Sequence, residues 1–288
     1  MSGGSNDTVI RAITDDGAFR VIAALTTSTV RGAASAQRAA GDVARTFGEL
    51  LTGAILIREA MAPRLRVQAI LKGGAGGGNM VADSHPDGTS RGLVRFGAGK
   101  DAGREPAAEG ALLQVMRTLP SGAIHQGVIA VPAGGGVSRG LMAYMQDSEQ
   151  VVSTIAVSTV VGDDGVIAAG GYMVQLLPEI ERGPLMIMTE RLDALPNLGD
   201  LLQKSDLTPD ELIGELLYGM PFTRLEASHL DFGCGCSQVR LMSSLATLPR
   251  SDIEDLIRDG EVLEINCDYC GKDYRIPPAQ LRSLLTSS

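Results

Sequence analysis

Four cysteines near the C-terminal end place the strongest constraint on what this 288-residue chain can fold into. They are the only cysteines in the chain, and they form two tight pairs, C-G-C and C-D-Y-C, separated by thirty residues. Two chelating pairs of thiolates can close around one tetrahedral zinc ion, with bonds from sulfur to metal of about 2.3 Å. The spacing therefore predicts a zinc site whose ligands are Cys234, Cys236, Cys267 and Cys270.

The residues around each pair support a metal site. The second pair lies between the strand-like segments EVLEIN and YRIP, so we expect it at the tip of a hairpin. Gly271 follows the last cysteine and lets the backbone turn toward the metal. The first pair has one intervening residue, and Gly235 supplies the permissive geometry that such close spacing needs.

Residues 231–288 are expected to form a small metal-dependent unit. Between the pairs, Ser251 and Glu254 predict the capping box of a helix that Gly260 ends, and a terminal helix is expected from about Pro278. The apolar content of this segment is too small for a stable fold on its own. A structural zinc ion would add on the order of 10 kcal/mol, and oxidation of the thiolates would take that contribution away.

The spacing alone leaves two interpretations open. In a redox switch, each pair would close on itself after the zinc has left, Cys234 with Cys236 and Cys267 with Cys270. In a constitutive zinc ribbon, the metal would stay bound and the unit would serve as an adaptor or binding module. A thiol oxidoreductase is disfavoured, because its C-x-x-C belongs at the mouth of a βα unit and not in a hairpin.

Composition narrows the cellular setting and the partners. The N-terminus lacks a basic segment followed by an apolar one, and the longest apolar stretch, 151–162, is shorter than the roughly 20 residues that span a bilayer. We therefore expect a cytoplasmic protein, in which paired cysteines are typical of metal or redox sites. The net charge of −9, without a run of Lys and Arg, disfavours nucleic acid and membranes as partners.

The part of the chain that precedes the cysteines predicts an α+β fold. A hairpin around Asp16 and Gly17, a long helix from Thr27 to about Met61, and further strands separated by Gly-rich turns make a mixed-sheet domain with core helices. This domain is expected to cover residues 1–178.

A helical connector is expected over residues 179–230. Leucines recur there on one side of the expected helices, and Thr208, Pro209 and Glu211 mark a helix start with a capping box. The small zinc-binding domain, 231–288, completes a predicted division into three parts.

No catalytic site is expected. The segment GVSRG at 136–140 matches a nucleophile elbow, but Pro132 to Gly135 separate it from the strand that should run into it. Ser138 is interpreted instead as the N-cap of a helix.

The arrangement of C-x-C, thirty residues and C-x-x-C resembles the heat-shock protein 33 family, the redox-regulated, ATP-independent holdase chaperones of bacteria. Other segments carry the likeness through most of the chain. They are VIRAITDDGAFRVIAALTTSTV near the start, GNMVADSHPDGTSRGLVR in the middle, SEQVVSTIAVSTVVGDDGVIAAGGYMVQLLP before the connector and LTPDELIGELLYG within it.

The resemblance implies a specific switch. The reduced protein would hold one Zn²⁺ and be inactive, and oxidation of the four cysteines to two disulfides would expel the metal. The C-terminal domain would then unfold, the connector would be destabilised, and apolar surface would become available to unfolding client proteins. Dimerisation would accompany activation. Such a holdase makes and breaks no bond in its client, so the resemblance implies no enzymatic activity.

Overall fold

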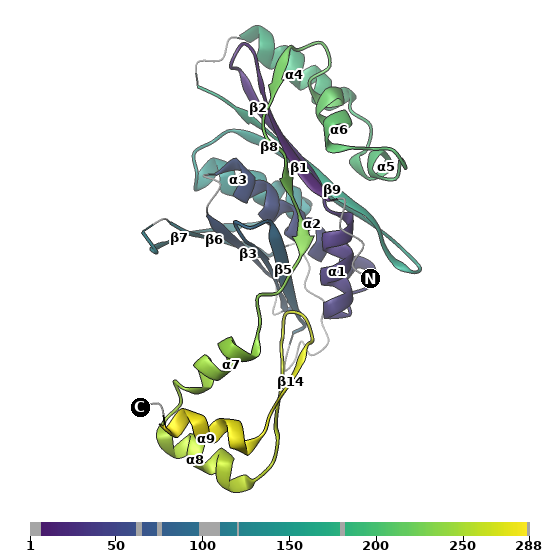
Figure 1. Ribbon diagram of the computed structural model, residues 1–288. Coiled ribbons are helices and arrows are strands. Elements are labelled where there is room, and N and C mark those ends of the chain that lie inside the picture. Colours follow the sequence, from purple (N-terminus) through teal and green to yellow (C-terminus); the bar gives the residue numbers. More distant parts are fainter. Residues whose placement is uncertain are drawn as a thin grey trace. The chain divides into compact units, whose positions relative to one another are not determined.

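The computed structural model describes residues 7–61, 65–73, 77–97, 110–119, 121–178 and 182–286. The chain divides into two compact units, Met1–Gly233 and Cys234–Ser288 (Figure 1). Among the described residues, strands and helices are combined without regular alternation, which confirms the α+β class. The finer division at residues 178 and 230 stays a prediction.

Sheet A of the first unit has six antiparallel strands in the order β10-β1-β2-β9-β8, with β11 also paired to β1. The hairpin of β1 and β2 turns through Gly17, whose φ of +71° suits glycine, and so confirms the predicted hairpin. The strands are β1 (Thr8–Thr14), β2 (Phe19–Leu25), β8 (Ser153–Gly162), β9 (Gly165–Leu176), β10 (Phe222–Arg224) and β11 (Ser228–His229).

Sheet B of the first unit has the order β12-β5-β4-β3-β6-β7 and is antiparallel except where β12 runs parallel to β5. Its strands are β3 (Arg66–Lys72), β4 (Asn79–Ser84), β5 (Thr89–Arg95), β6 (Leu112–Thr118), β7 (Ile124–Ala130) and β12 (Asp231–Phe232). Strand β6 is a finding that the sequence did not predict, and it pairs along its whole length with both β3 and β7.

Helix α2 (Gly41–Ala60) forms the centre of the main core, because it packs against β3 and β4 of sheet B and against β8 and β9 of sheet A. The single helix expected from Thr27 to about Met61 is wrong. Arg38 adopts a left-handed conformation and ends α1 (Thr27–Gln37), so that α2 starts anew at Gly41.

Helix α3 (Gly136–Asp147) lies against β7 and β8, and Leu141 and Tyr144 on it are fully buried. Its N-cap is Gly135, so the assignment of Ser138 as the N-cap is wrong. The Ser138 hydroxyl lies inside the helix and accepts a hydrogen bond from the backbone N–H of Val157, 3.1 Å away, which ties α3 to sheet A.

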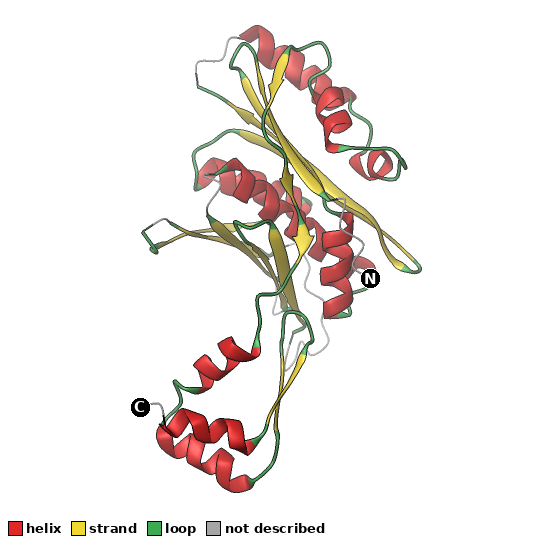
Figure 2. Ribbon diagram, in the orientation of Figure 1, coloured by secondary structure: helices red, strands yellow, loops and turns green. Residues whose placement is uncertain are grey.

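The second face of sheet A is covered by α4 (Arg182–Ala194), α5 (Leu198–Leu202) and α6 (Pro209–Leu216), as Figure 2 shows. Thr208 caps α6 and forms the predicted capping box with Glu211. A second apolar core results. Its buried residues are Ile10, Ala12, Ala18, Phe19, Val21, Ala23, Ala168, Tyr172 and Val174 of the sheet side, with Met188, Leu198, Leu201, Leu202, Leu212, Ile213, Leu216 and Leu217 of the helical side.

The helical interpretation fails for the end of the predicted connector. Residues 221–229, which we call the strap, form the short strands β10 and β11 along β1. Beyond the strap, Leu230 is fully buried in the main core. Phe232 packs against the same core and lies over Gly32, where a Cβ atom would come within 2.8 Å of the Phe232 Cβ.

The second unit contains α7 (Gln238–Leu245), α8 (Arg250–Asp259), the hairpin β13 (Leu263–Asn266) and β14 (Asp273–Ile276), and α9 (Pro278–Thr286). One helix was expected between the cysteine pairs and two are present. The N-cap of α8 is Pro249, so the capping box of Ser251 and Glu254 is wrong, whereas Gly260 ends the helix in a left-handed conformation as predicted. Among the described residues of this unit, the buried apolar side chains are Ile253, Tyr274, Ile276 and Leu281.

Candidate metal centre

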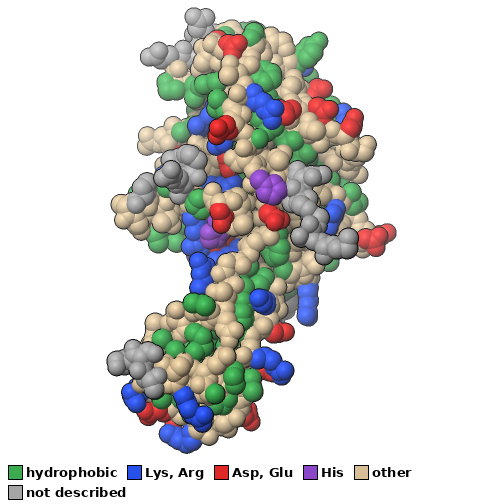
Figure 3. Space-filling view, in the orientation of Figure 1, with side chains coloured by type: hydrophobic (Ala, Val, Ile, Leu, Met, Phe, Trp, Pro, Cys, Tyr) green, Lys and Arg blue, Asp and Glu red, His purple; other side chains and the backbone are tan. Residues whose placement is uncertain are grey.

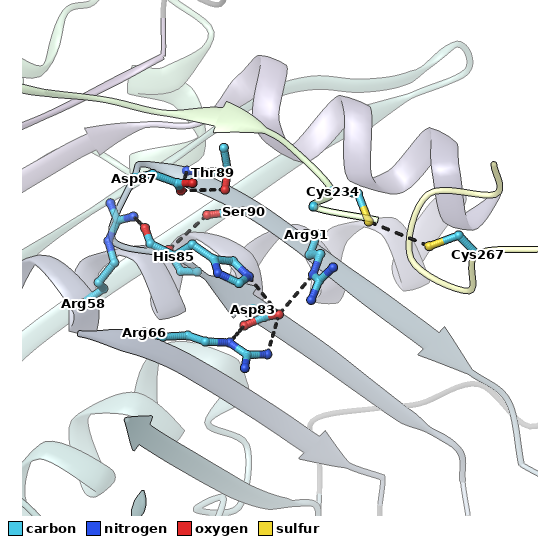
Figure 4. A network of polar contacts seen from close by, with 12 residues as sticks. Arg58, Arg66, Asp83, His85, Asp87, Thr89, Ser90, Arg91, Cys234 and Cys267 are labelled. Atoms are coloured by element: carbon cyan, nitrogen blue, oxygen red, sulfur yellow. Dashed lines mark hydrogen bonds and ion pairs between the residues drawn. The ribbon is translucent and has the colours of Figure 1, made fainter. Parts of the chain in front are cut away.

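The four cysteine sulfurs form one cluster in the second unit, where all of them lie within 4.8 Å of one another. Across the two pairs, the Sγ atoms of Cys234 and Cys267 are 3.7 Å apart (Figure 4), and those of Cys236 and Cys270 are 3.4 Å apart. Sulfurs at the corners of a tetrahedron around zinc, with bonds of about 2.3 Å, are separated by about 3.8 Å. The donor atoms and their spacing therefore fit a zinc ion.

The hairpin predicted for the second pair is present. Strands β13 and β14 are in register from Leu263 and Ile276 to Asn266 and Asp273, so the second pair lies at the tip. At the tip, the Cys267 N–H donates to the Lys272 carbonyl over 2.9 Å, and the Gly271 N–H donates to the Cys267 carbonyl over 2.8 Å. Gly271 has a φ of +69°, which confirms its expected role in the turn.

The first pair is positioned by the helix that follows it. Ser237 caps α7 by accepting a hydrogen bond from the Arg240 N–H, and the Arg240 side chain donates to the Gly235 carbonyl over 2.9 Å. A Cβ atom on residue 235 would lie 2.8 Å from Nη1 of Arg240. Gly235 thus gives the Arg240 guanidinium room to approach the backbone between the two cysteines.

Tyr274 contacts the cluster, although the sequence analysis did not single it out. Its hydroxyl donates a hydrogen bond to Sγ of Cys236 over 3.1 Å, and this bond raises the pKa of Tyr274 to about 12. The ammonium of Lys272 lies 5.3 Å from the centre of the Tyr274 ring. The sequence carries no local signal for this contact, because Cys236 and Tyr274 are 38 positions apart.

In the absence of a cation, burial favours the protonated form of two of the thiols. Burial raises the pKa of Cys267, and burial also raises the pKa of Cys270 to about 12. A bound metal ion reverses this preference, because its positive charge stabilises the thiolate form of each ligand. The cluster is therefore suited to hold a metal ion with all four sulfurs deprotonated.

A second polar cluster, on sheet B, joins three strands (Figure 4). The buried carboxylate of Asp83 on β4 accepts hydrogen bonds from Arg66 of β3 over 2.6 and 2.8 Å, from Arg91 of β5 over 3.1 Å, and pairs with His85 over 3.1 Å. Burial alone would raise the pKa of Asp83, but the bonds from His85 and Arg66 outweigh it and hold the pKa well below its usual range. The Asp83 carboxylate therefore forms a clamp, that is, a set of charge-assisted hydrogen bonds that cross-links β4 to β3 through Arg66 and to β5 through Arg91.

Comparison with known proteins now decides the family. The model of the Hsp33 protein family matches residues 7–277. The chain belongs to the Hsp33 family. Members of the Hsp33 family named 33 kDa chaperonin include the protein of Syntrophotalea carbinolica, 30% identical over 97% of this chain and 99% of its own length. The relative from Thermoanaerobacter sp. strain X514 is 28% identical over 97% of this chain and 98% of its own length.

The fold agrees with that of a solved Hsp33 homolog. The crystal structure of the 33 kDa chaperonin from Thermotoga maritima superimposes with a TM-score of 0.83, covers 98% of each chain and is 22% identical in sequence. The resemblance seen in the cysteine spacing is thus confirmed, and this member of the Hsp33 family is a redox-regulated chaperone. Among the described residues, no helix has the length and apolar character to cross a membrane.

Proposed function

We propose that this chaperone is a cytoplasmic holdase that binds unfolding proteins without catalysis after its cysteines are oxidised. In the reduced state, Cys234, Cys236, Cys267 and Cys270 hold one Zn²⁺ per chain, and in the oxidised state they form two disulfides. A homodimer is the proposed active form. The observation that carries this proposal is the four-sulfur cluster, because its loss would remove the main support of the second unit.

The second unit depends on its metal site because its apolar core is small. Its buried apolar side chains are the four named above, whereas the first unit has two extended apolar cores. Bound zinc would supply a cross-link between the two cysteine pairs. Oxidation of the thiolates takes away the ligands, and the remaining core is too small to keep the unit folded.

The proposed disulfides join sequence neighbours, Cys234 with Cys236 and Cys267 with Cys270. In the folded unit, every sulfur lies within 4.8 Å of the others, and the cross-pair distances are 3.7 and 3.4 Å, so the pairing is decided after the unit unfolds. After the metal has left and the unit has unfolded, only the neighbours in each pair stay close, because a cross-pair bond would have to close a loop of about thirty residues.

The apolar surface that clients need is present beneath the predicted connector. Helices α4, α5 and α6 bury Phe19, Val21 and Tyr172 of sheet A, and their removal would expose a continuous apolar face. The helices would at the same time free their own apolar side, which includes Leu212 and Ile213. Undocking of the connector would thus provide two apolar surfaces for unfolded chains.

The test is zinc release under peroxide, followed with a chromogenic chelator, together with light scattering of a heat-unfolding client protein. We expect one zinc ion per chain to leave and suppression of aggregation to begin only afterwards. Mass spectrometry of the oxidised protein should find a disulfide within each pair. Zinc that stays bound under peroxide would instead support a constitutive zinc-ribbon adaptor. Zinc that leaves without a gain of client protection would contradict the proposed link between oxidation and chaperone activity.

A further inference from the structure

The strap is attached to sheet A mainly through its backbone. Residues 222–224 pair with Ala12 to Thr14, and Ser228 and His229 pair with Val9 and Thr8. The side chains of 221–227 are all exposed, and even the large apolar ones, Phe222 and Leu225, keep 38% and 43% of their surface in solvent. Little hydrophobic free energy therefore holds the strap in place.

The strap covers one alternating set of backbone groups on β1. The hydrogen bonds run from the Leu225 N–H to the Arg11 carbonyl over 2.8 Å, from the Leu230 N–H to the Asp7 carbonyl over 3.0 Å, and from the Asp15 N–H to the Pro221 carbonyl over 3.0 Å. The partners of the strap on β1 and at its ends are thus the backbone groups of the odd-numbered residues Asp7, Arg11 and Asp15. Because backbone groups alternate in direction along a strand, the even-numbered residues face β2. Without the strap, the odd-numbered groups form an open sheet edge.

This edge stays ordered when the strap leaves, because β1 has other supports. It pairs with β2 along Thr8 to Ile13, and Ile10 and Ala12 are buried. The guanidinium of Arg11 donates to the Glu226 carbonyl and the Ser228 hydroxyl of the strap, and it also pairs with the buried Glu59 of α2 over 3.1 Å. The Arg11 side chain therefore keeps its position after the strap contacts are lost.

The position of the strap in the chain links it to the proposed switch. It directly follows the residues that anchor the end of α6, including the buried Leu217, and it directly precedes the buried Leu230. When the connector undocks, the strap loses its attachment on one side and gains the conformational freedom of an unanchored segment. Its few backbone bonds then compete with water along an exposed edge.

We propose that the edge of β1 is a docking site for extended segments of client polypeptide, which pair with Thr8 to Thr14 in place of the strap. Any unfolded protein can offer backbone N–H and C=O groups to such an edge, whatever its side chains. The strap itself shows that an extended segment fits there. This inference rests on the proposed function, because oxidation must free the strap before a client can bind.

Hydrogen exchange of single backbone amides, followed by NMR, tests the proposal in the full-length protein. The probe client is α-lactalbumin kept unfolded by reduction and carboxymethylation of its cysteines. We expect the odd-numbered amides of Val9 and Ile13, which lie opposite Ser228 and Thr223 of the strap, to be protected in the reduced protein. After oxidation they should exchange within about tenfold of the rate of an unstructured peptide. Addition of the client should restore their protection, while the even-numbered amides of Ile10 and Ala12 stay protected throughout.

Two outcomes would overturn the proposal. Odd-numbered amides that stay protected after oxidation, through their own strap or that of a second copy, would show that the edge is never open. Odd-numbered amides that remain unprotected in the client complex would show that clients bind elsewhere. Light scattering on the same sample separates these outcomes from failure of the proposed function, because in both of them the oxidised protein would still suppress aggregation.

Two synthetic peptides that differ by one methyl group test the pairing by competition. The unmodified peptide, residues 220–230, should compete with the unfolded client for the oxidised protein. The same peptide methylated on the backbone nitrogen of Leu225 cannot donate to the Arg11 carbonyl, so we expect it to compete about tenfold less well. Equal competition by the two peptides would contradict pairing at the β1 edge.

Discussion

The two units of this chaperone are stabilised by different means. The first unit surrounds α2 and covers both faces of sheet A with apolar side chains, so its stability is spread over many contacts. The second unit has few buried apolar side chains, and its four sulfurs converge within 4.8 Å. Stability concentrated in one metal site can be removed by one chemical event, whereas stability spread over a core cannot.

Removal of zinc with a chelator, without any oxidant, should cause the largest difference in stability between the two units. We expect the second unit to lose on the order of 10 kcal/mol and unfold, because its core cannot replace the metal. Hydrogen exchange measured by mass spectrometry should show rapid exchange from residue 234 onward and unchanged protection in α2. Addition of zinc should restore the protection of the second unit. A second unit that stays protected without metal would show that its stability does not depend on the metal site.

Substitution Leu212→Ala tests how much the apolar core beneath α6 contributes to the stability of the first unit. Leu212 on α6 is fully buried against sheet A, so the cavity should cost about 2–5 kcal/mol in urea-induced unfolding of the first unit. The control Leu185→Ala removes a side chain that is 42% exposed, and its effect should stay within about 0.5 kcal/mol. Both variants should bind one zinc ion per chain. A lower zinc content in Leu212→Ala would show that the two kinds of stability are coupled.

Substitution Asp83→Asn should make the first unit less sensitive to acid. Because hydrogen bonds hold the pKa of Asp83 below its ordinary value of 3.8, its ionised form stabilises the folded state above pH 3.8. That contribution is lost as the pH falls from 3.8 through the lower pKa of the folded state. At neutral pH we expect a loss of about 1–2 kcal/mol, moderated because Arg66 is 40% exposed.

Acid titration of the unfolding free energy provides the measurement for Asp83. The exposed Asp42, which pairs with Arg45 at the surface, is the control, and Asp42→Asn should leave the curve unchanged. An Asp83→Asn protein with the same acid dependence as the original would show that the clamp contributes no pH-dependent stability.

Substitution Tyr274→Phe should have the smallest effect and should confine it to the second unit. The change removes the hydroxyl that donates to Sγ of Cys236 but keeps the ring beneath Lys272. Partners of metal ligands are worth tenfold or more in affinity, and we expect about tenfold weaker zinc binding in competition with a chromogenic chelator. Lys272→Met keeps the hydroxyl bond and should bind zinc more tightly than Tyr274→Phe. The reverse order would assign the effect to the cation and not to the hydrogen bond.

The features that the sequence predicted well are local ones. Two pairs of cysteines around Gly235 and ahead of Gly271 indicate a chelating cluster whatever the rest of the chain does. The capping box of Thr208 and Glu211 is equally local. Tyr274 could not be found in this way, because its contact with Cys236 joins residues 38 positions apart and depends on how β14 lies beside the cluster.

The features that were missed depend on tertiary pairing. Strand β6 has the sequence LLQVMRT, whose apolar residues do not alternate cleanly, and it is a strand because β3 and β7 hold it on both sides. The strap consists of strands of three and two residues, too short for any periodicity. The break after α1 lies at Arg38, which adopts the left-handed conformation although Gly or Asn is the usual residue there.

Phe232 packs over Gly32 two residues before the first cysteine, and a side chain at position 32 would push this ring away. Leu230, two residues earlier, is fully buried in the same core. We expect this pair of residues to hold the chain on the core while the second unit unfolds on one side of it and the strap is released on the other. The released strap would then be a tethered segment, and its attachment at Leu230 would keep it close to β1 for re-pairing once the thiols and the metal have returned.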